Sequence, residues 1–197
     1  AGYNPAVREK TADDIAFELE IPANRGDLLS HLGIAREIAI FLGTTPRLPD
    51  ATIEETIPDR VSVRVADATD CPYYSCRVIR NVGVAPSPNW LRCSVEKLGF
   101  RSTSTVVDLS NLVMAETGQP LHVFDLSRIR GGISVRRSVH GEVITTIDGR
   151  TRTLPDGVLL IADEGGPIAI AGIMGAATSE VIDTTRDVLI ESACFTP

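Results

Sequence analysis

The stretch Asp108–Asp125, DLSNLVMAETGQPLHVFD, sets the expected architecture of the chain. Its first half predicts a short helix, because Asp108 is a good N-cap residue and apolar side chains recur along one helical face. Gly118 predicts the C-terminal end of that helix. Pro120 then fixes its own φ and keeps the preceding residue out of the helical region, so the chain turns and becomes extended. The stretch therefore predicts a helix, a tight polar corner and an extended segment.

One histidine, His122, stands in the extended segment between Leu121 and Val123. Successive side chains of a strand point to opposite faces, so His122 is expected on the other face from its two neighbours, toward a cleft. The alternative is a hydrogen-bonded core histidine that fixes the corner, since buried polar groups are usually paired for structural reasons. Spacing alone favours this alternative.

Outward from this stretch, the hydrophobic pattern predicts two more helices and several short strands. One helix is capped by Asp27 and ends at Gly43. The other is capped by Ser87, has Pro88 as its first residue and ends at Gly99. The expected strands are Ile15–Ile21, Val61–Val65, Tyr73–Val82, Ile133–Arg137, Glu142–Ile147, Val158–Ala162, Ile168–Ile173 and Val188–Ile190. This pattern predicts an α+β fold of packed mixed or antiparallel β-sheets, with a sandwich-like core flanked by a few helices.

Two segments are expected to be irregular. Residues 1–12 are polar and predicted to be loose, and Thr44–Arg60 contains three prolines and an acidic run, as expected of a linker. Trp90 follows the phase of the apolar residues Leu91 and Val95, so we assign it to the core and not to a platform for stacking a base.

Composition limits the class of protein. Hydrophobic residues make up 43% and charged residues 23% of the 197 residues, which is ordinary for a folded domain. The net charge is 19 − 26 = −7, which argues against a stand-alone RNA binder of the basic-patch type. The end of an RNA held by other domains remains a possible ligand. Four scattered cysteines and the lack of a signal pattern or a long apolar run fit a cytoplasmic protein, and no metal site is expected.

Two further places could carry chemistry. Gly172 and Gly175, in the sequence GIMG, follow an apolar strand; they permit a tight turn or the close approach of a ligand to the backbone. Glu191 stands at the end of the apolar strand VLIE, where burial would be costly without a hydrogen-bond donor. The alternative for Glu191 is a strand-end carboxylate that faces water. Arg101 reads as an ordinary surface residue.

Several motifs resemble, in order along the chain, the B3/B4 editing region of the bacterial phenylalanyl-tRNA synthetase beta chain: VVDLSN, GQPLHVFD, AIAGIMG and LIESA. The resemblance implies hydrolysis of the ester in tyrosine wrongly attached to tRNA for phenylalanine. It assigns His122 to the editing site and Glu191 to reading the tyrosine hydroxyl. It assigns substrate binding to Arg101, Ser110, Asn111, Gly172 and Gly175. It also implies that residues 1–48 are the returning half of a split small domain, with the editing domain in residues 49–197.

The resemblance further implies the partners: the 3′ end of a tRNA carrying tyrosine, the remainder of the beta chain and the alpha chain, with no cofactor in this fragment. The sequence departs from the motifs of this family at three places. Ser110 replaces the more usual Thr, and Ser104-Thr105 stands where many relatives have Asn-Asn. Ala176 replaces the last Gly of the common MGG and adds a methyl group that could narrow the pocket. Two alternatives remain. One is a non-catalytic module that joins RNA and subunits; the other is a free-standing relative that edits in trans, against which the missing initiator Met argues.

Overall fold

The structure is a computed structural model that describes residues 5–10 and 14–196. The helices are α1 (His31–Leu42), α2 (Asn89–Lys97) and α3 (Thr105–Thr117), with 3₁₀ turns at Gly26–Leu28 and Leu126–Arg128. The strands are β1 (Pro5–Lys10), β2 (Ile15–Leu19), β3 (Val63–Val65), β4 (Tyr73–Ile79), β5 (Leu121–Asp125), β6 (Ile133–Arg137), β7 (Val143–Thr145), β8 (Thr151–Thr153), β9 (Leu159–Asp163), β10 (Gly166–Ile170), β11 (Met174–Gly175) and β12 (Val188–Cys194).

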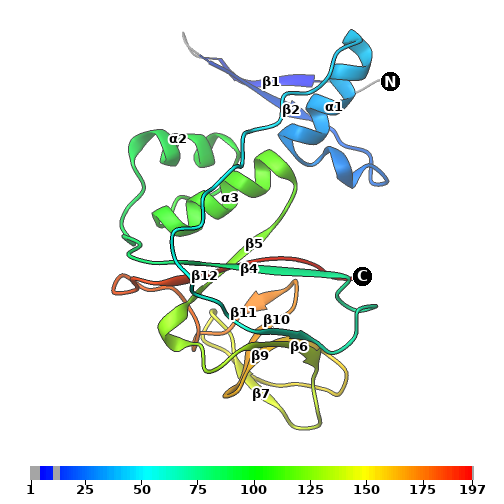
Figure 1. The fold of residues 1–197 in the computed structure, drawn as a ribbon. Helices are drawn as coiled ribbons and strands as arrows, with labels where there is room; N and C mark the ends of the chain where they lie inside the picture. Colours follow the sequence, from blue (N-terminus) through cyan, green and yellow to red (C-terminus); the bar gives the residue numbers. More distant parts are fainter. Residues whose placement is uncertain (1–4, 11–13, 197) are drawn as a thin grey trace.

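Two sheets face one another and form the centre of the fold. One has three antiparallel strands in the order β4-β12-β5; the other has five, in the order β11-β10-β9-β6-β3, with β3 parallel to β6. Strands β1 and β2 pair as one separate hairpin and β7 and β8 as another. Figure 1 shows the three-stranded sheet between helices α2 and α3 on one side and the five-stranded sheet on the other. The predicted α+β fold with packed mixed and antiparallel sheets is confirmed.

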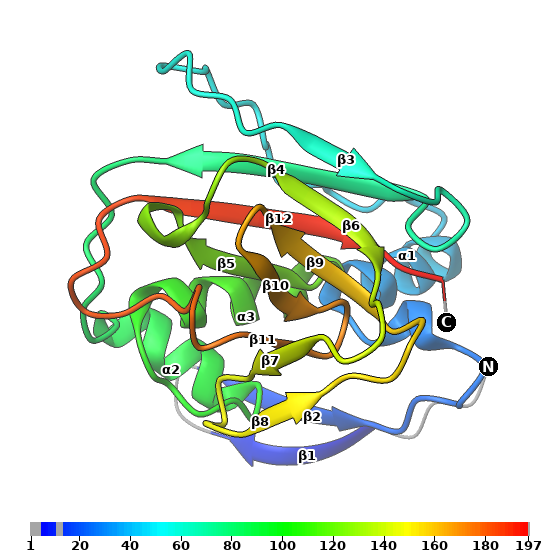
Figure 2. The ribbon, with the colours of Figure 1, turned by 90° about the horizontal axis from the view of Figure 1, so that it is seen from below.

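The main core fills the space between these sheets. Phe124 and Leu189 come from the three-stranded sheet, and Ile133, Ile161 and Ile168 come from the five-stranded one; none is more than 3% exposed. Burial of such side chains provides the main driving force for joining the sheets. A smaller cluster of Ile144, Leu154, Leu160 and Ala176 lies beside the β7-β8 hairpin, which Figure 2 shows at the edge of the five-stranded sheet.

Helix α3 ends as predicted but begins earlier than predicted. Gly118 adopts φ 81° at its C-terminal end, whereas the N-cap is Ser104, so Asp108 is not the cap. Asp108 instead lies fully buried in the first turn, where its carboxylate accepts hydrogen bonds from the hydroxyls of Ser87 and Ser102, both at 2.6 Å. The hydroxyls that fix Asp108 come from the loops on either side of α2, so this site depends on tertiary structure.

The other two predicted helix starts were also misplaced. Ser30, and not Asp27, caps α1, and its hydroxyl accepts a hydrogen bond from the Gly33 amide at 3.1 Å. Pro88 is the N-cap of α2 instead of its first residue, and the Ser87 hydroxyl donates a hydrogen bond to Asp108 instead of capping the helix.

Trp90 was wrongly assigned to the core. It is 61% exposed, whereas Leu91 and Val95 are buried. Leu91 and Val95 are four residues apart and share one helical face, but Trp90 is rotated by about 100° from Leu91 and points outward.

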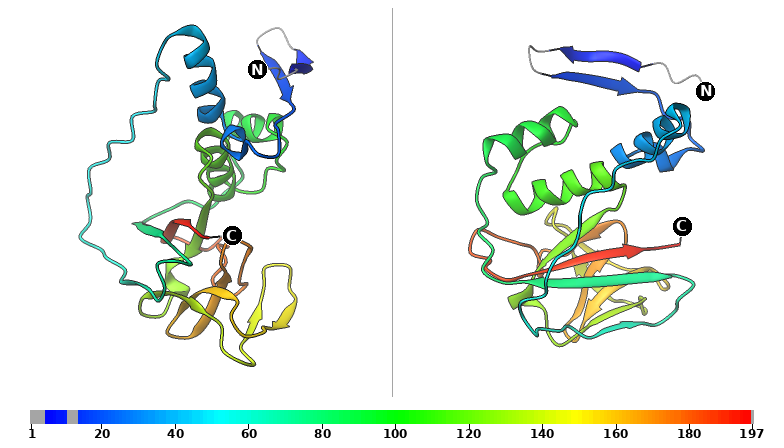
Figure 3. Two further views of the ribbon diagram at one scale, coloured as in Figure 1. Left: turned by 90° about the vertical axis from the view of Figure 1, so that its right-hand side faces the viewer. Right: turned by 45° about the horizontal axis from the view of Figure 1, so that its top comes forward.

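The N-terminal part contains more regular structure than predicted, whereas the segment after α1 is irregular as predicted. Residues 5–10 form β1, which pairs with β2, although the sequence predicted a loose segment. Residues 45–62 contain no helix or strand and run along the side of the molecule, in cyan in Figure 3. Several large apolar side chains near the end of α1 are exposed: Ile38, Ile40, Phe41 and Leu42. No described helix has the length and apolar character needed to cross a membrane.

Candidate functional site

His122 and Glu191 lie directly opposite each other on neighbouring strands. The register of β5 and β12 pairs these two residues, and it also pairs Phe124 with Leu189 two positions further on. Side chains two apart on a strand share a face, and Phe124 and Leu189 belong to the core between the sheets. His122 and Glu191 therefore point toward the five-stranded sheet. The predicted separation of His122 from Leu121 and Val123 is confirmed.

Glu191 is a buried carboxylate held by a phenol. Its residue exposure is 7%, so the alternative of a carboxylate facing water is wrong. It also lies in the middle of β12 instead of at a strand end, because Ser192 and Ala193 continue the pairing with β4. The hydroxyl of Tyr74 donates a hydrogen bond to Oε2 of Glu191 at 2.7 Å. Burial raises the pKa of Glu191, and the hydrogen bond from Tyr74 partly offsets this effect.

His122 is half-buried and held by packing. Its ring meets Phe124 edge to face, with ring centroids 4.4 Å apart and an interplanar angle of 69°. Burial lowers the pKa of His122, which favours the neutral imidazole near neutral pH. Its ring forms no hydrogen bond with another described residue, so the structure does not support a hydrogen-bonded core histidine within the residues it describes.

The polar atoms of this pair remain accessible. In the part of the chain that the structure describes, no fully buried side-chain nitrogen or oxygen lacks a hydrogen-bond partner. The ring nitrogens of His122 have no such partner, and the hydrogen bond from Tyr74 engages only Oε2 of Glu191. The ring nitrogens and Oε1 of Glu191 must therefore retain some accessible surface, where a ligand or water could bind them.

Gly175 allows the His122 ring to lie against the backbone of β11. A Cβ atom at Gly175 would stand 2.7 Å from Cε1 and 2.9 Å from Nε2 of His122. Gly172 has φ 66° in the turn before β11, and a Cβ there would meet Phe195 at 3.3 Å. Ala176 does not narrow this site as predicted. Its methyl group packs in the smaller core, because residue 176 points to the opposite side from Gly175.

The other predicted site residues lie elsewhere. Ser110 and Asn111 belong to α3, which packs on the face of the three-stranded sheet away from His122 and Glu191. The Ser110 hydroxyl donates to the Val106 carbonyl at 2.9 Å, within its own helix. Arg101 is exposed in the connection between α2 and α3, in agreement with the surface interpretation. The structure thus brings together His122, Glu191 and Gly175, but not Ser110 and Asn111.

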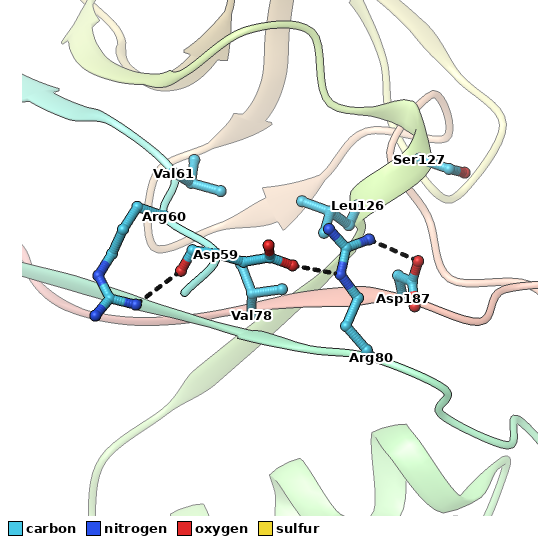
Figure 4. Close-up of a pocket in the computed structure, with 8 residues that line it drawn as sticks. All are labelled: Asp59, Arg60, Val61, Val78, Arg80, Leu126, Ser127 and Asp187. Carbon is cyan, nitrogen blue, oxygen red and sulfur yellow. Dashed lines mark hydrogen bonds and ion pairs between the residues drawn. The ribbon is translucent and has the colours of Figure 1, made fainter. Parts of the chain in front are cut away.

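Three cavities lie away from this pair. Figure 4 shows one of about 350 Å³, where Arg80 forms ion pairs with Asp59 and Asp187, each at 2.7 Å. A second, of about 580 Å³, lies beside it along β4 and the linker, and a third, of about 570 Å³, lies between the N-terminal part and helices α2 and α3. Neither His122 nor Glu191 lines any of the three. The cleft expected beside His122 is therefore not among these three cavities, and the phenol found against Glu191 is that of Tyr74.

Metal binding has no support from the described residues, which contain no group of three or more His, Cys, Asp or Glu side chains placed to hold an ion. The four cysteines are free thiols. Cys76 on β4 is the cross-strand partner of Glu191, and burial, followed by the charge of Glu191, raises the pKa of this thiol. A raised pKa keeps the thiol protonated and makes it a poor nucleophile.

Sequence reasoning missed Tyr74. The sequence showed it only as a member of an apolar-rich strand, and its partner lies 117 residues further along the chain. The one available signal was Glu191 itself, since a carboxylate in an apolar strand requires a donor. The identity of that donor depends on the pairing of β4 with β12, which no local pattern predicts.

The fold and the site together define a class of protein: an α+β domain with two facing sheets and a buried carboxylate paired across strands with an imidazole. The chain belongs to the B3/4 domain family, which it matches over residues 70–197. The resemblance of the motifs is thereby confirmed at the level of the family.

Curated relatives are phenylalanine–tRNA ligase beta subunits. That of Syntrophus aciditrophicus is 46% identical over 188 residues, covering 93% of this chain and 23% of the relative. That of Rhodopirellula baltica is 39% identical over 201 residues, covering 100% of this chain and 30% of the relative. The chain thus spans only about a quarter of the length of these relatives. An N-terminal fragment of the phenylalanyl-tRNA synthetase beta subunit from Pyrococcus horikoshii shares the fold, with a TM-score of 0.54 and 17% identity over 98% of this chain and 60% of that one.

Proposed function

We propose that this chain is the editing part of a phenylalanyl-tRNA synthetase beta chain and hydrolyses the ester of tyrosine misattached to tRNA for phenylalanine. The observation that carries the proposal is the buried carboxylate of Glu191, which already accepts a phenol hydroxyl at 2.7 Å and lies directly across from His122. A second observation, the membership in the B3/4 family and the similarity to beta subunits of the ligase, supports it.

The need for a separate editing site follows from the similar shapes of phenylalanine and tyrosine, which differ by one hydroxyl. An apolar pocket built for phenylalanine rejects an isostere that only adds a hydroxyl by about 100-fold. A second site has to select for that hydroxyl. Glu191 would do so by accepting a charge-assisted hydrogen bond from tyrosine, which phenylalanine cannot donate.

In the proposed reaction, a water oxygen attacks the ester carbonyl carbon, the bond to the ribose oxygen breaks, and tyrosine and the free tRNA 3′ end are released. A neutral His122 can accept a hydrogen bond from this water or orient the ester through its accessible ring nitrogens. The backbone near Gly172 and Gly175 would line the substrate. Because Ser110 and Asn111 lie on the helix side of the sheet, we propose that they and Arg101 contact parts of the aminoacyl-tRNA other than the phenol.

The proposed setting is the intact synthetase in the cytoplasm. The remainder of the beta chain and the alpha chain would hold the tRNA and present its 3′ end, since an acidic chain has little general attraction for RNA. Hydrolysis needs only water, so the proposal includes no cofactor. We further propose that residues 1–48 belong to a separate small domain, for which the exposed apolar side chains at the end of α1 are the supporting observation.

A second candidate is a non-catalytic module of the same synthetase that joins RNA or subunits. Two observations favour it: Tyr74 already donates to the carboxylate that would read the substrate, and the three cavities described above do not include His122 or Glu191. A module of this kind would bind its partners without clearing tyrosine.

The test is deacylation of Tyr-tRNA for phenylalanine by the intact synthetase that carries Glu191→Ala. We expect the rate of tyrosine clearance to fall by roughly 10- to 100-fold, the value of a lost hydrogen bond to a charged group. Attachment of phenylalanine to the tRNA should not change. The matched control is Glu116→Ala, an exposed carboxylate on α3 on the other side of the sheet. Unchanged tyrosine clearance in Glu191→Ala would remove the assigned role and favour the non-catalytic module.

A further inference from the structure

Tyr74 lies next to Glu191 in the sheet and can fix the orientation of its carboxylate. It lies on β4, and Glu191 lies on the neighbouring strand β12; Tyr74 pairs with Ala193 and Cys76 pairs with Glu191. Tyr74 and Glu191 are therefore diagonal neighbours on the same face of the sheet, a spacing that a long aromatic side chain can bridge. The phenol hydroxyl donates to Oε2 at 2.7 Å.

Among the described residues, Tyr74 and not a cation contacts the carboxylate of Glu191. Among the described residues, no Lys, Arg or His forms an ion pair with Glu191. Cys76 and His122 are its direct cross-strand neighbours, and burial, followed by the charge of Glu191, raises the pKa of the Cys71 thiol. None of these groups stabilises the ionised carboxylate by a described hydrogen bond. Tyr74 is thus the side chain that offsets the cost of burying the charge.

The hydrogen bond from Tyr74 also makes the two carboxylate oxygens of Glu191 different from each other. Tyr74 engages Oε2, whereas Oε1 retains accessible surface, as deduced above. An ionised carboxylate accepts about four hydrogen bonds, so a bond from Tyr74 leaves capacity for a second phenol. A protonated carboxyl can accept the phenol hydrogen bond only without the assistance of a charge, so the contrast between tyrosine and phenylalanine would be weaker.

We propose that Tyr74 is a positioning residue for the discrimination of tyrosine: its hydroxyl holds Oε2 of Glu191, so that Oε1 faces the hydroxyl of the bound substrate. This inference rests on the proposed function and adds to it a residue that the motifs do not assign. A competing possibility is that Tyr74 occupies the place of the substrate phenol and blocks it. The two alternatives predict opposite effects of removing the hydroxyl.

The test compares Tyr74→Phe with Tyr73→Phe in the intact synthetase. Both changes remove one phenol oxygen from β4, but Tyr73 is 60% exposed and its side chain points to the other face of the strand. For Tyr74→Phe we expect kcat/KM for deacylation of Tyr-tRNA to fall by about tenfold or more, the effect of a lost hydrogen bond to a charged group. Tyr73→Phe should behave as the wild type.

A second measurement separates positioning from a general structural effect. Without its donor the pKa of Glu191 rises further, so the acidic limb of the pH profile for tyrosine clearance should move to higher pH in Tyr74→Phe. His122, Cys76 and Cys71 remain in both proteins. Faster clearance in Tyr74→Phe would show that Tyr74 blocks the site, and an unchanged rate or pH profile would also overturn the proposal. Because Glu191→Ala tests the hydrolysis itself, loss of activity there with a normal Tyr74→Phe variant would refute only the positioning role.

Discussion

Gly175→Ala should displace the imidazole of His122 without changing any charge. The added Cβ would lie 2.7 Å from Cε1 and 2.9 Å from Nε2 of the ring. Ordinary contacts between carbon atoms begin near about 3.5 Å, so one of the two groups has to retreat by about 0.8 Å. The ring has little room, because Phe124, which is fully buried, packs against it with centroids 4.4 Å apart.

The magnitude follows from this crowding. Overfilling a packed core costs about 1–3 kcal/mol, and in a chain of this size each kcal/mol lowers the melting temperature by about 2–4 °C. We therefore expect thermal unfolding of Gly175→Ala to begin roughly 2–12 °C below that of the wild type. If the chain has the function proposed above, tyrosine clearance by the intact synthetase should fall as well, because a displacement of this size disturbs catalytic geometry.

Gly83→Ala provides the matched control. Gly83 has no atom within 4 Å of its ideal Cβ position and does not adopt a positive φ. Alanine there should leave stability unchanged or raise it by about 0.4–1 kcal/mol through the unfolded chain. If Gly175→Ala melts at the same temperature as Gly83→Ala and clears tyrosine normally, the ring does not lie where the structure places it, and this reasoning fails.

Two further predictions concern the helices. Trp90→Ala should change the free energy of unfolding by no more than about 0.5 kcal/mol in a denaturant titration, because the side chain is 61% exposed; a loss of several kcal/mol would return Trp90 to the core. Asp108→Asn should flatten the fall in stability below about pH 4. Burial acts to raise the pKa of Asp108, but hydrogen bonds from Ser102, Ser87 and the Thr103 amide lower it. A lowered pKa gives stability that is present above the unfolded value and lost as pH falls through the folded value. Identical acid unfolding curves for the two proteins would contradict this account.

The sequence predicts best where local rules decide the outcome. Three features that depend on side-chain period and turn chemistry were predicted and are present in the structure. They are the alternation around His122, the end of α3 at Gly118 and the strand Ile133–Arg137. Strands β8 and β11 were not predicted, because their sequences, TRT and MG, carry no alternating apolar pattern, and they form through pairing with β7 and β10.

Tertiary partners explain the remaining errors. Asp108 has the residue type of a cap, but two hydroxyls from outside the helix, those of Ser87 and Ser102, bind it inside the first turn. Similarly, the burial of Glu191 depends on a strand on either side of β12 and on a phenol far away in the sequence. The sequence predicted His122, Glu191 and Gly175 for the candidate site, but Tyr74 could be found only from the pairing of the strands.

Glu191 should also reduce the stability of the fold that carries it. Its pKa is raised by burial, so protonation of the folded protein stabilises it below the unfolded pKa, and this contribution is lost as pH rises through the folded pKa. Glu191→Gln keeps the shape and can still accept the hydrogen bond from Tyr74, but it removes the buried charge. We therefore expect the Gln variant to gain stability relative to the wild type on going from pH 5 to pH 8, while tyrosine clearance falls. Chemical unfolding at both pH values measures this difference, with Glu116→Gln as the exposed control. Should the Gln variant lose stability relative to the wild type as pH rises, the ionised Glu191 would stabilise the fold. The argument that this carboxylate costs stability and is present for substrate recognition would then be refuted.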